Sequence, residues 1–186
     1  MTLDEIFIKN GTDKSSLSHN YASAYEKHLP SKVNKFLEIG CYKGAGIRSF
    51  KEWYGEGKFY ALDRFLDGHG LITIEQLQSE GINAFHGDQK DMWFLEQIKD
   101  VFEVIIDDGS HHWADQITTF TLMFKNNVAS GGWYVIEDIF DDVYWGQGLI
   151  KEAKDNIRGK LKRNEILPEL IGEAHYYDEV IFVKRK

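Results

Sequence analysis

Two apolar runs of this sequence end in clusters of acidic and imidazole side chains. Residues 104–112 read VIIDDGSHH, and residues 131–138 read GGWYVIED. If the two runs are neighbouring buried strands, several carboxylates and a histidine meet at one edge of a sheet. Like charges packed together cost free energy unless something offsets them. A divalent cation with oxygen ligands is the simplest offset, so the pattern predicts an enzyme that activates a hydroxyl group beside a metal.

The spacing of apolar residues and turn signals predicts strands that alternate with helices. Parallel strands are expected at 36–39, 58–62, 82–85, 104–106 and 133–136, and helices at 45–54, 73–80, 92–99, 114–124 and 149–164. Residues 3–29 read as helical with a turn at 11–16, and residues 172–177 and 179–184 as a closing pair of strands. The predicted fold is α/β: a Rossmann-like, doubly wound, mostly parallel seven-stranded sheet with an antiparallel C-terminal hairpin.

Length and composition favour one enzyme-sized domain over residues 1–186, with an N-terminal helical cap region at 1–32 and a core at 33–186. The net charge of -8 argues against a nucleic-acid partner. The lone Cys41, the lack of a signal-peptide pattern and the lack of a long apolar run predict a cytoplasmic protein without a membrane partner. The oligomeric state is left open, and a homo-oligomer is compatible with the sequence.

Acidic residues follow each predicted parallel strand, where ligands of open α/β sheets bind. They are Glu38, Asp63, Asp88, Asp107 with Asp108, and Glu137 with Asp138. This pattern favours a cationic or hydroxyl-rich ligand over a phosphate. Between the first two acids, Gly40 and Gly44 allow a ligand to approach the backbone closely. Their spacing does not fit the GxGxxG pattern of nicotinamide-binding proteins.

Several of these segments resemble a known enzyme family. Residues 36–46, 60–63 and 86–88 resemble the first three motifs of class I S-adenosylmethionine-dependent methyltransferases. The DDGSH segment at 107–111, the GGWYVIED segment, the YW pair at 144–145 and the early GTDK at 11–14 resemble the metal-dependent macrolide sugar O-methyltransferases of the mycinamicin and macrocin type. The resemblance covers nearly the whole chain.

The resemblance implies a role for individual residues of this sequence. For S-adenosylmethionine it implies Glu38, Ile39, Gly40, Cys41, Gly44, Asp63, Arg64, Gly87, Asp88, Gln89 and Asp107, with Asp63 at the ribose and Asp88 and Gln89 at the adenine. For Mg²⁺ it implies Asp108, Glu137 and Asp138, and for the general base His111; Mn²⁺ or Ca²⁺ would suit the same ligands. For the substrate it implies Tyr144, Trp145, His19 and Tyr25.

The chemistry accounts for these residue types. A sugar hydroxyl is too weak an acid to attack a methyl group at neutral pH, whereas a metal lowers its pKa and an imidazole takes its proton. Glu137 and Asp138 can share one metal only if the strand has ended or bulged before them, because neighbouring strand residues point to opposite faces. The same rule separates Asp107 from Asp108, and the sequence leaves open which of the two faces the metal.

The leading interpretation is a Mg²⁺-dependent O-methyltransferase that acts on a sugar hydroxyl of a glycosylated natural product or a polysaccharide precursor. Three alternatives stay open. The acceptor could be a non-sugar diol such as a catechol, since the acid cluster fits both. The chain could be a cofactor-binding scaffold without turnover. A nicotinamide oxidoreductase is the least favoured, because its glycine spacing is missing.

Overall fold

The strands form a single mixed sheet. The structure, a computed structural model, describes residues 1–66, 71–139 and 156–186. In this part of the chain the strand order is β3-β2-β1-β4-β5-β7-β6. The strands are β1 (Lys35–Ile39), β2 (Lys58–Asp63), β3 (Ile82–His86), β4 (Phe102–Asp107), β5 (Val128–Ile136), β6 (Ile171–Tyr176) and β7 (Ile181–Arg185). The first five pair in parallel, and β7 lies antiparallel between β5 and β6. The predicted Rossmann-like α/β fold with a C-terminal antiparallel hairpin is confirmed.

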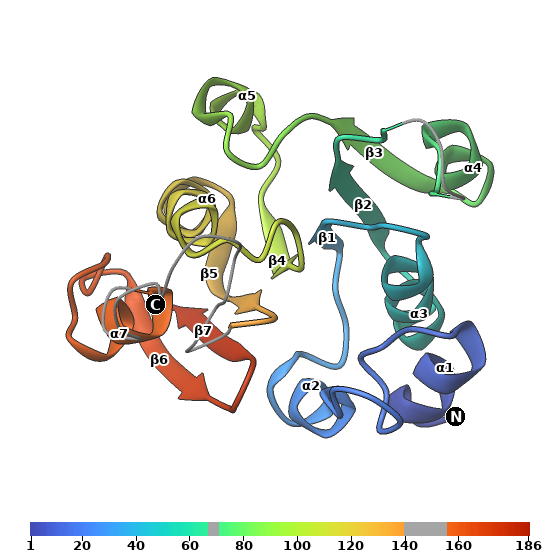
Figure 1. The fold of residues 1–186 in the computed structure, drawn as a ribbon, viewed down its shortest axis with the longest axis horizontal. Coiled ribbons are helices and arrows are strands. Elements are labelled where there is room, and N and C mark those ends of the chain that lie inside the picture. Colours follow the sequence, from blue (N-terminus) through green and yellow to red (C-terminus); the bar gives the residue numbers. More distant parts are fainter. Residues whose placement is uncertain (67–70, 140–155) are drawn as a thin grey trace, which may run out of the picture.

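Helices cover both faces of this sheet (Figure 1). One face carries α1 (Leu3–Asn10), α2 (Ala22–His28), α3 (Ala45–Tyr54) and α4 (Ile74–Ser79), and the other carries α5 (Met92–Gln97), α6 (Trp113–Asn126) and α7 (Ile157–Lys162). Each face has its own apolar core. Strand β5 shows the alternation: Trp133 and Val135 belong to one core, and Tyr134 and Ile136 to the other.

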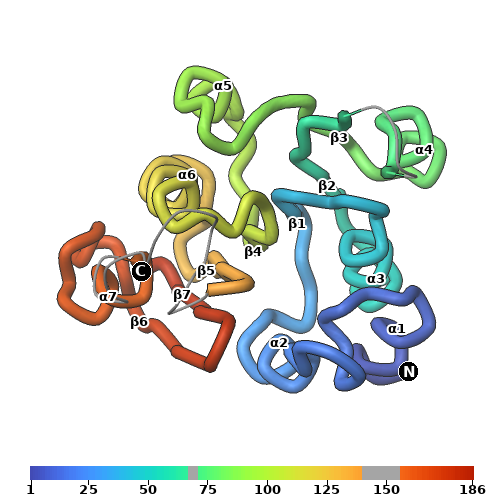
Figure 2. The backbone as a smooth tube through the Cα atoms, viewed as in Figure 1, coloured from blue at the N-terminus to red at the C-terminus, as the bar shows by residue number. Residues whose placement is uncertain are grey.

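The chain between α1 and α2 crosses toward the sheet without helical structure. A capping box of Thr2 and Glu5 starts α1, and Gly11, at a φ of 72°, ends it. The interruption is longer than predicted, because regular helix resumes only at Ala22. The backbone tube in Figure 2 shows α2 between α1 and the β6–β7 hairpin. This path brings N-terminal side chains to the carboxyl ends of the strands.

Other boundaries differ from the predictions for local reasons. Strand β5 begins at Val128, five residues early, because the GG pair continues a strand whose register shifts opposite Phe102 and Val104. Helix α7 ends at Lys162, since Asn164 has a φ of 56°. The earlier part of that predicted helix, 149–155, lies outside the described residues. Within the described ranges no helix combines the length and apolar character needed to cross a membrane.

Candidate active site

The turns that follow β1 and β4 touch each other at the centre of the sheet. Gly40 leaves β1 with a φ of 80°, and a Cβ atom there would lie 2.1 Å from the Asp108 carbonyl oxygen. Only glycine tolerates both the left-handed backbone and this approach. The strand order reverses direction between β1 and β4, which is where ligands of open α/β sheets bind. The predicted cofactor turn and the predicted acid cluster therefore share one site.

Two adjoining cavities of about 180 and 660 Å³ open at this edge, and both are lined by Gly40, Asp63, Arg64 and Gly109. Nine of the eleven residues predicted for the cofactor line one or both: Glu38, Ile39, Gly40, Cys41, Asp63, Arg64, Gly87, Asp88 and Gln89. The other two lie elsewhere. Gly44 begins α3 with a φ of 79°, and Asp107 is enclosed by neighbouring side chains. The cleft has the size expected for a small-molecule site.

The carboxylate of Asp63 fixes the shape of this cleft. Its Oδ2 accepts a hydrogen bond of 2.8 Å from the Cys41 backbone N–H, and its Oδ1 accepts one of 2.6 Å from the Arg64 N–H. One side chain thus ties the turn after β1 to the turn after β2. It also lines both cavities. Asp63 is therefore placed to hold the loops and to face a ligand at the same time.

Glu38 is a buried carboxylate without hydrogen-bond partners. It is 1% exposed, and within the described ranges neither side-chain oxygen makes a hydrogen bond of normal geometry. Burial raises its pKa to about 8, and the nearby Lys14 ammonium opposes this only in part. An unpaired buried carboxylate is costly. Because Glu38 lines the larger cavity, a cationic ligand group could supply the missing partner.

We expect Glu38→Gln to stabilise the ligand-free protein by roughly 2 kcal/mol at pH 8, where about one unit of pKa shift is worth 1.4 kcal/mol. The folded-state pKa lies above the unfolded value, so the wild type loses stability as the pH rises from about 4.5 to about 8. The amide has no such loss. Urea unfolding between pH 5 and 8 measures the difference, with the exposed Glu56→Gln as control. Parallel curves for wild type and Glu38→Gln would contradict the assignment.

Asp107 and Asp108 point to different surroundings, as strand geometry requires. Asp107 accepts hydrogen bonds from Gln89 (3.2 Å) and Tyr134 (3.0 Å), and burial raises its pKa to about 7. Through Gln89, whose Oε1 accepts from the Ser110 N–H at 2.6 Å, it supports the wall of the smaller cavity. Asp108 instead lines the larger cavity and faces the acids that follow β5.

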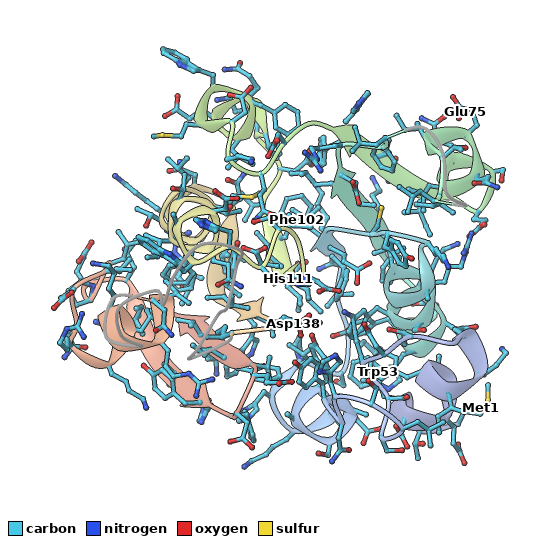
Figure 3. The ribbon with its side chains drawn as sticks, viewed as in Figure 1. Met1, Trp53, Glu75, Phe102, His111 and Asp138 are labelled. Carbon is cyan, nitrogen blue, oxygen red and sulfur yellow. The ribbon has the colours of Figure 1, made fainter. Side chains whose placement is uncertain are left out.

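The imidazole of His111 lies between two of the predicted metal ligands. Its Nε2 is 3.1 Å from Asp108 Oδ1 and its Nδ1 is 3.4 Å from Asp138 Oδ2. Figure 3 shows His111 and Asp138 facing each other near the middle of the molecule. Both have positive φ angles, 55° and 52°, which non-glycine residues seldom adopt and which often mark functional positions. Strand β5 ends at Ile136, so the acids after it are free of strand alternation.

The sequence analysis assigned no role to Lys14, which the structure places in the middle of the acid cluster. Its ammonium forms ion pairs with Asp108 and, at 2.6 Å, with Glu137. Burial alone would lower the pKa of Lys14, but these carboxylates raise it well above its ordinary value. Burial would raise the pKa of Asp108, yet Lys14 and His111 hold it below its usual range. A charged ammonium therefore offsets part of the negative charge that the sequence analysis attributed to a metal.

Two N-terminal tyrosines hold the acids after β5. Tyr25 donates to Glu137, and Tyr21 donates to Asp138 at 2.8 Å. Tyr25 is fully buried, so the structure gives this predicted substrate residue a position behind the acids. His19, half-buried, contacts Glu179 at 2.8 Å. The other predicted substrate residues, Tyr144 and Trp145, lie outside the described residues.

The cluster has the donors that a small divalent cation needs. Asp108, His111 and Asp138 offer ligand atoms that lie within 4.8 Å of one another. Carboxylate oxygens suit Mg²⁺, Mn²⁺ and Ca²⁺. Glu137, the remaining predicted ligand, has its oxygens on Lys14 and Tyr25, and burial raises its pKa to about 7. The residues present therefore fit such an ion, with Glu137 the least available of the predicted ligands.

Comparison with known proteins places this fold and site in a class. The chain superposes over its full length on the mycinamycin methyltransferase MycE solved with Mg, S-adenosylhomocysteine (SAH) and mycinamycin VI, with a TM-score of 0.81 and 30% identity, and it covers 54% of that chain. A second MycE structure, with Mg and SAH, gives a TM-score of 0.83. The fold is thus the Rossmann-like fold of class I methyltransferases. No family model matches the sequence.

The curated relatives narrow the class. The chain is 33% identical over 177 residues to the mycinamicin VI 2''-O-methyltransferase of Micromonospora griseorubida (86% of this chain, 42% of that protein). It is 29% identical over 188 residues to a tetracenomycin rhamnosyl 3'-O-methyltransferase of Streptomyces olivaceus (94% and 45%). The chain is a homologue of the macrolide and tetracenomycin sugar O-methyltransferases. It spans about half the length of the curated relatives it matches.

Proposed function

We propose that this chain is an S-adenosylmethionine-dependent and Mg²⁺-dependent O-methyltransferase that acts on a sugar hydroxyl of a glycosylated natural product or a polysaccharide precursor. The observation that carries the proposal is the position of His111. This imidazole bridges Asp108 and Asp138 while lining the same cleft as Glu38 and Asp63. The relatives, whose names describe methyl transfer to sugars of macrolides and tetracenomycins, support the choice of acceptor.

For the cofactor, we assign the cleft residues by charge and position. Glu38 would pair with a cationic group of the cofactor, and Asp63 would accept the ribose hydroxyls. The smaller cavity, lined by Asp88 and Gln89, would take the adenine. Asp107 would act only through Gln89, and Gly44 only by starting α3, because neither lines the cleft.

For the chemistry, S-adenosylmethionine supplies the methyl group and Mg²⁺, held by Asp108 and Asp138 with Glu137 beside them, lowers the pKa of the acceptor hydroxyl. The acceptor oxygen bonds to the methyl carbon as the carbon–sulfur bond breaks, leaving SAH. His111 takes the hydroxyl proton at Nδ1, the nitrogen with the longer contact. Asp108, through Nε2, keeps the ring oriented.

For the organisation of the chain, we propose that residues 1–186 act as one methyltransferase domain. The support is that the cap region at 1–32 supplies Lys14, Tyr21 and Tyr25, each of which contacts an acid of the core. Tyr144, Trp145 and His19 remain the proposed substrate contacts.

A methyl-transfer assay tests the function. The protein is incubated with labelled S-adenosylmethionine and a panel of acceptors that includes mycinamicin VI, a rhamnosyl tetracenomycin and, for comparison, a catechol. We expect transfer to a glycoside that stops when EDTA removes the metal. Transfer to the catechol alone would contradict the sugar assignment, and transfer that is unchanged in EDTA would contradict the metal.

A further inference from the structure

Lys14 occupies a position at which a lysine side chain is costly to bury. The residue is 1% exposed, and its ammonium lies among the carboxylates of Asp108, Glu137 and, farther away, Glu38. The cost of burying a cation is offset only when charged partners surround it. Its partners come from the ends of β1, β4 and β5, so one side chain joins three strands through charge.

The oxygens that Lys14 uses are the ones a metal would need. Its ammonium contacts Asp108 Oδ2 and Glu137 Oε2, while Tyr25 takes the other oxygen of Glu137 and His111 the other oxygen of Asp108. A divalent cation that binds Asp108 and Asp138 must therefore either share oxygens with the ammonium or lie against it. In both cases two positive charges are brought close together.

The ammonium cannot withdraw into solvent without local unfolding. The Lys14 carbonyl accepts from the Tyr21 N–H at 3.0 Å, and the next turn is anchored by Ser16, whose N–H and hydroxyl donate to Asp4 at 2.7 Å. The side chain passes Gly46, where a Cβ atom would lie 3.1 Å from Lys14 Cε. Both its backbone and its stem are thus enclosed.

The charge balance suggests what this arrangement does. The ammonium neutralises one of the three charges that Asp108, Glu137 and Asp138 carry when ionised, which leaves the amount that one divalent cation carries. Without Lys14, the metal-free cluster would hold three uncompensated charges at close range. Such a cluster is unstable by itself and attracts a cation more strongly.

We propose that Lys14 is a tethered counter-cation of the metal site: it stabilises the metal-free protein and weakens the binding of the divalent cation. The inference rests on the proposed metal-dependent function and deepens it, because it assigns the residue that sets metal affinity. Lys14 acts as a positioning residue, since it holds carboxylates and touches neither the proposed acceptor nor the cofactor.

The test compares Lys14→Met with wild type by Mg²⁺ calorimetry and by thermal unfolding in EDTA. Losing one partner of a buried ion pair is expected to lower the unfolding temperature in EDTA by about 10 °C. The same variant is expected to bind Mg²⁺ at least about tenfold more tightly, since a nearby positive charge has been removed. Lys9→Met, which removes an exposed ion pair with Glu52, is the matched control and should leave Mg²⁺ affinity unchanged.

A merely structural lysine would give the opposite result for the metal. If Lys14→Met binds Mg²⁺ with wild-type or weaker affinity, the inference is wrong while the proposed function stands. If wild type itself binds no divalent cation, the metal-dependent function falls as well. Should Lys14→Met fail to fold in EDTA, the double variant Lys14→Met with Glu137→Gln decides. Because it removes one charge of each sign, it should regain most of the lost unfolding temperature, and no recovery would overturn the counter-cation role.

Discussion

Replacement of His111 by asparagine is expected to lower kcat for methyl transfer by about a thousandfold, within the range for loss of a general base. The affinity for SAH should change by less than about twofold. The reason is geometric: the imidazole lies between Asp108 and Asp138 and lines the cleft, and an amide of similar size keeps the hydrogen bonds but cannot take a proton. Steady-state kinetics at saturating substrates, with SAH calorimetry beside it, measures both quantities.

The neighbouring His112 provides the control for that experiment. Its side chain is 51% exposed, and it lies 4.0 Å from Asp115, away from the acid cluster. His112→Asn should keep kcat within about twofold of wild type. If His111→Asn retains more than a tenth of the wild-type kcat, this imidazole is not the base.

Asp138→Asn is expected to weaken Mg²⁺ binding by at least about a hundredfold and to reduce methyl transfer correspondingly. Asp138 is the predicted ligand that makes no ion pair with Lys14, and an amide supplies a weaker ligand without charge. Calorimetric titration with Mg²⁺ measures the loss. Asp138→Asn with wild-type Mg²⁺ affinity would place the metal elsewhere.

Tyr21→Phe is the companion variant, because it leaves the carboxylate in place but removes the hydroxyl that donates to Asp138. We expect a smaller loss of Mg²⁺ affinity, about threefold to tenfold, since one hydrogen bond to a charged group contributes on the order of 1.5–3 kcal/mol and other contacts still hold the acid. A Tyr21→Phe effect as large as that of Asp138→Asn would indicate general disruption of the loop.

The sheet and the edge that carries the site could be predicted because they depend on local patterns. Apolar runs of strand length separated by amphipathic segments fix βαβ units, and these place Asp63, Asp108 and Glu137 at one edge. The separation of Asp107 from Asp108 also follows from strand alternation. The side of each was decided by partners from other elements, Tyr134 for one and Lys14 for the other.

The role of Lys14 could not be predicted from spacing, because 94 and 123 residues separate it from its partners. A lysine in a turn is ordinarily solvated, and the GTDK segment carries no periodicity that would mark it as buried. Tyr25 was named, but its contact with Glu137 depends on how α2 packs on β7, where its ring meets Phe182. One signal was present: a cluster of acids calls for a positive charge, and a lysine can meet that need as well as a metal.

The most direct test of the central claim is a calorimetric titration of SAH into the wild type and Asp63→Ala, each with and without Mg²⁺. Asp91→Ala is the matched control, because Asp91 also accepts from a backbone N–H, that of Phe94, but does not line the cleft. We expect micromolar binding to the wild type and the control, and its loss in Asp63→Ala. If the wild type binds no SAH under either condition, the methyltransferase assignment is contradicted.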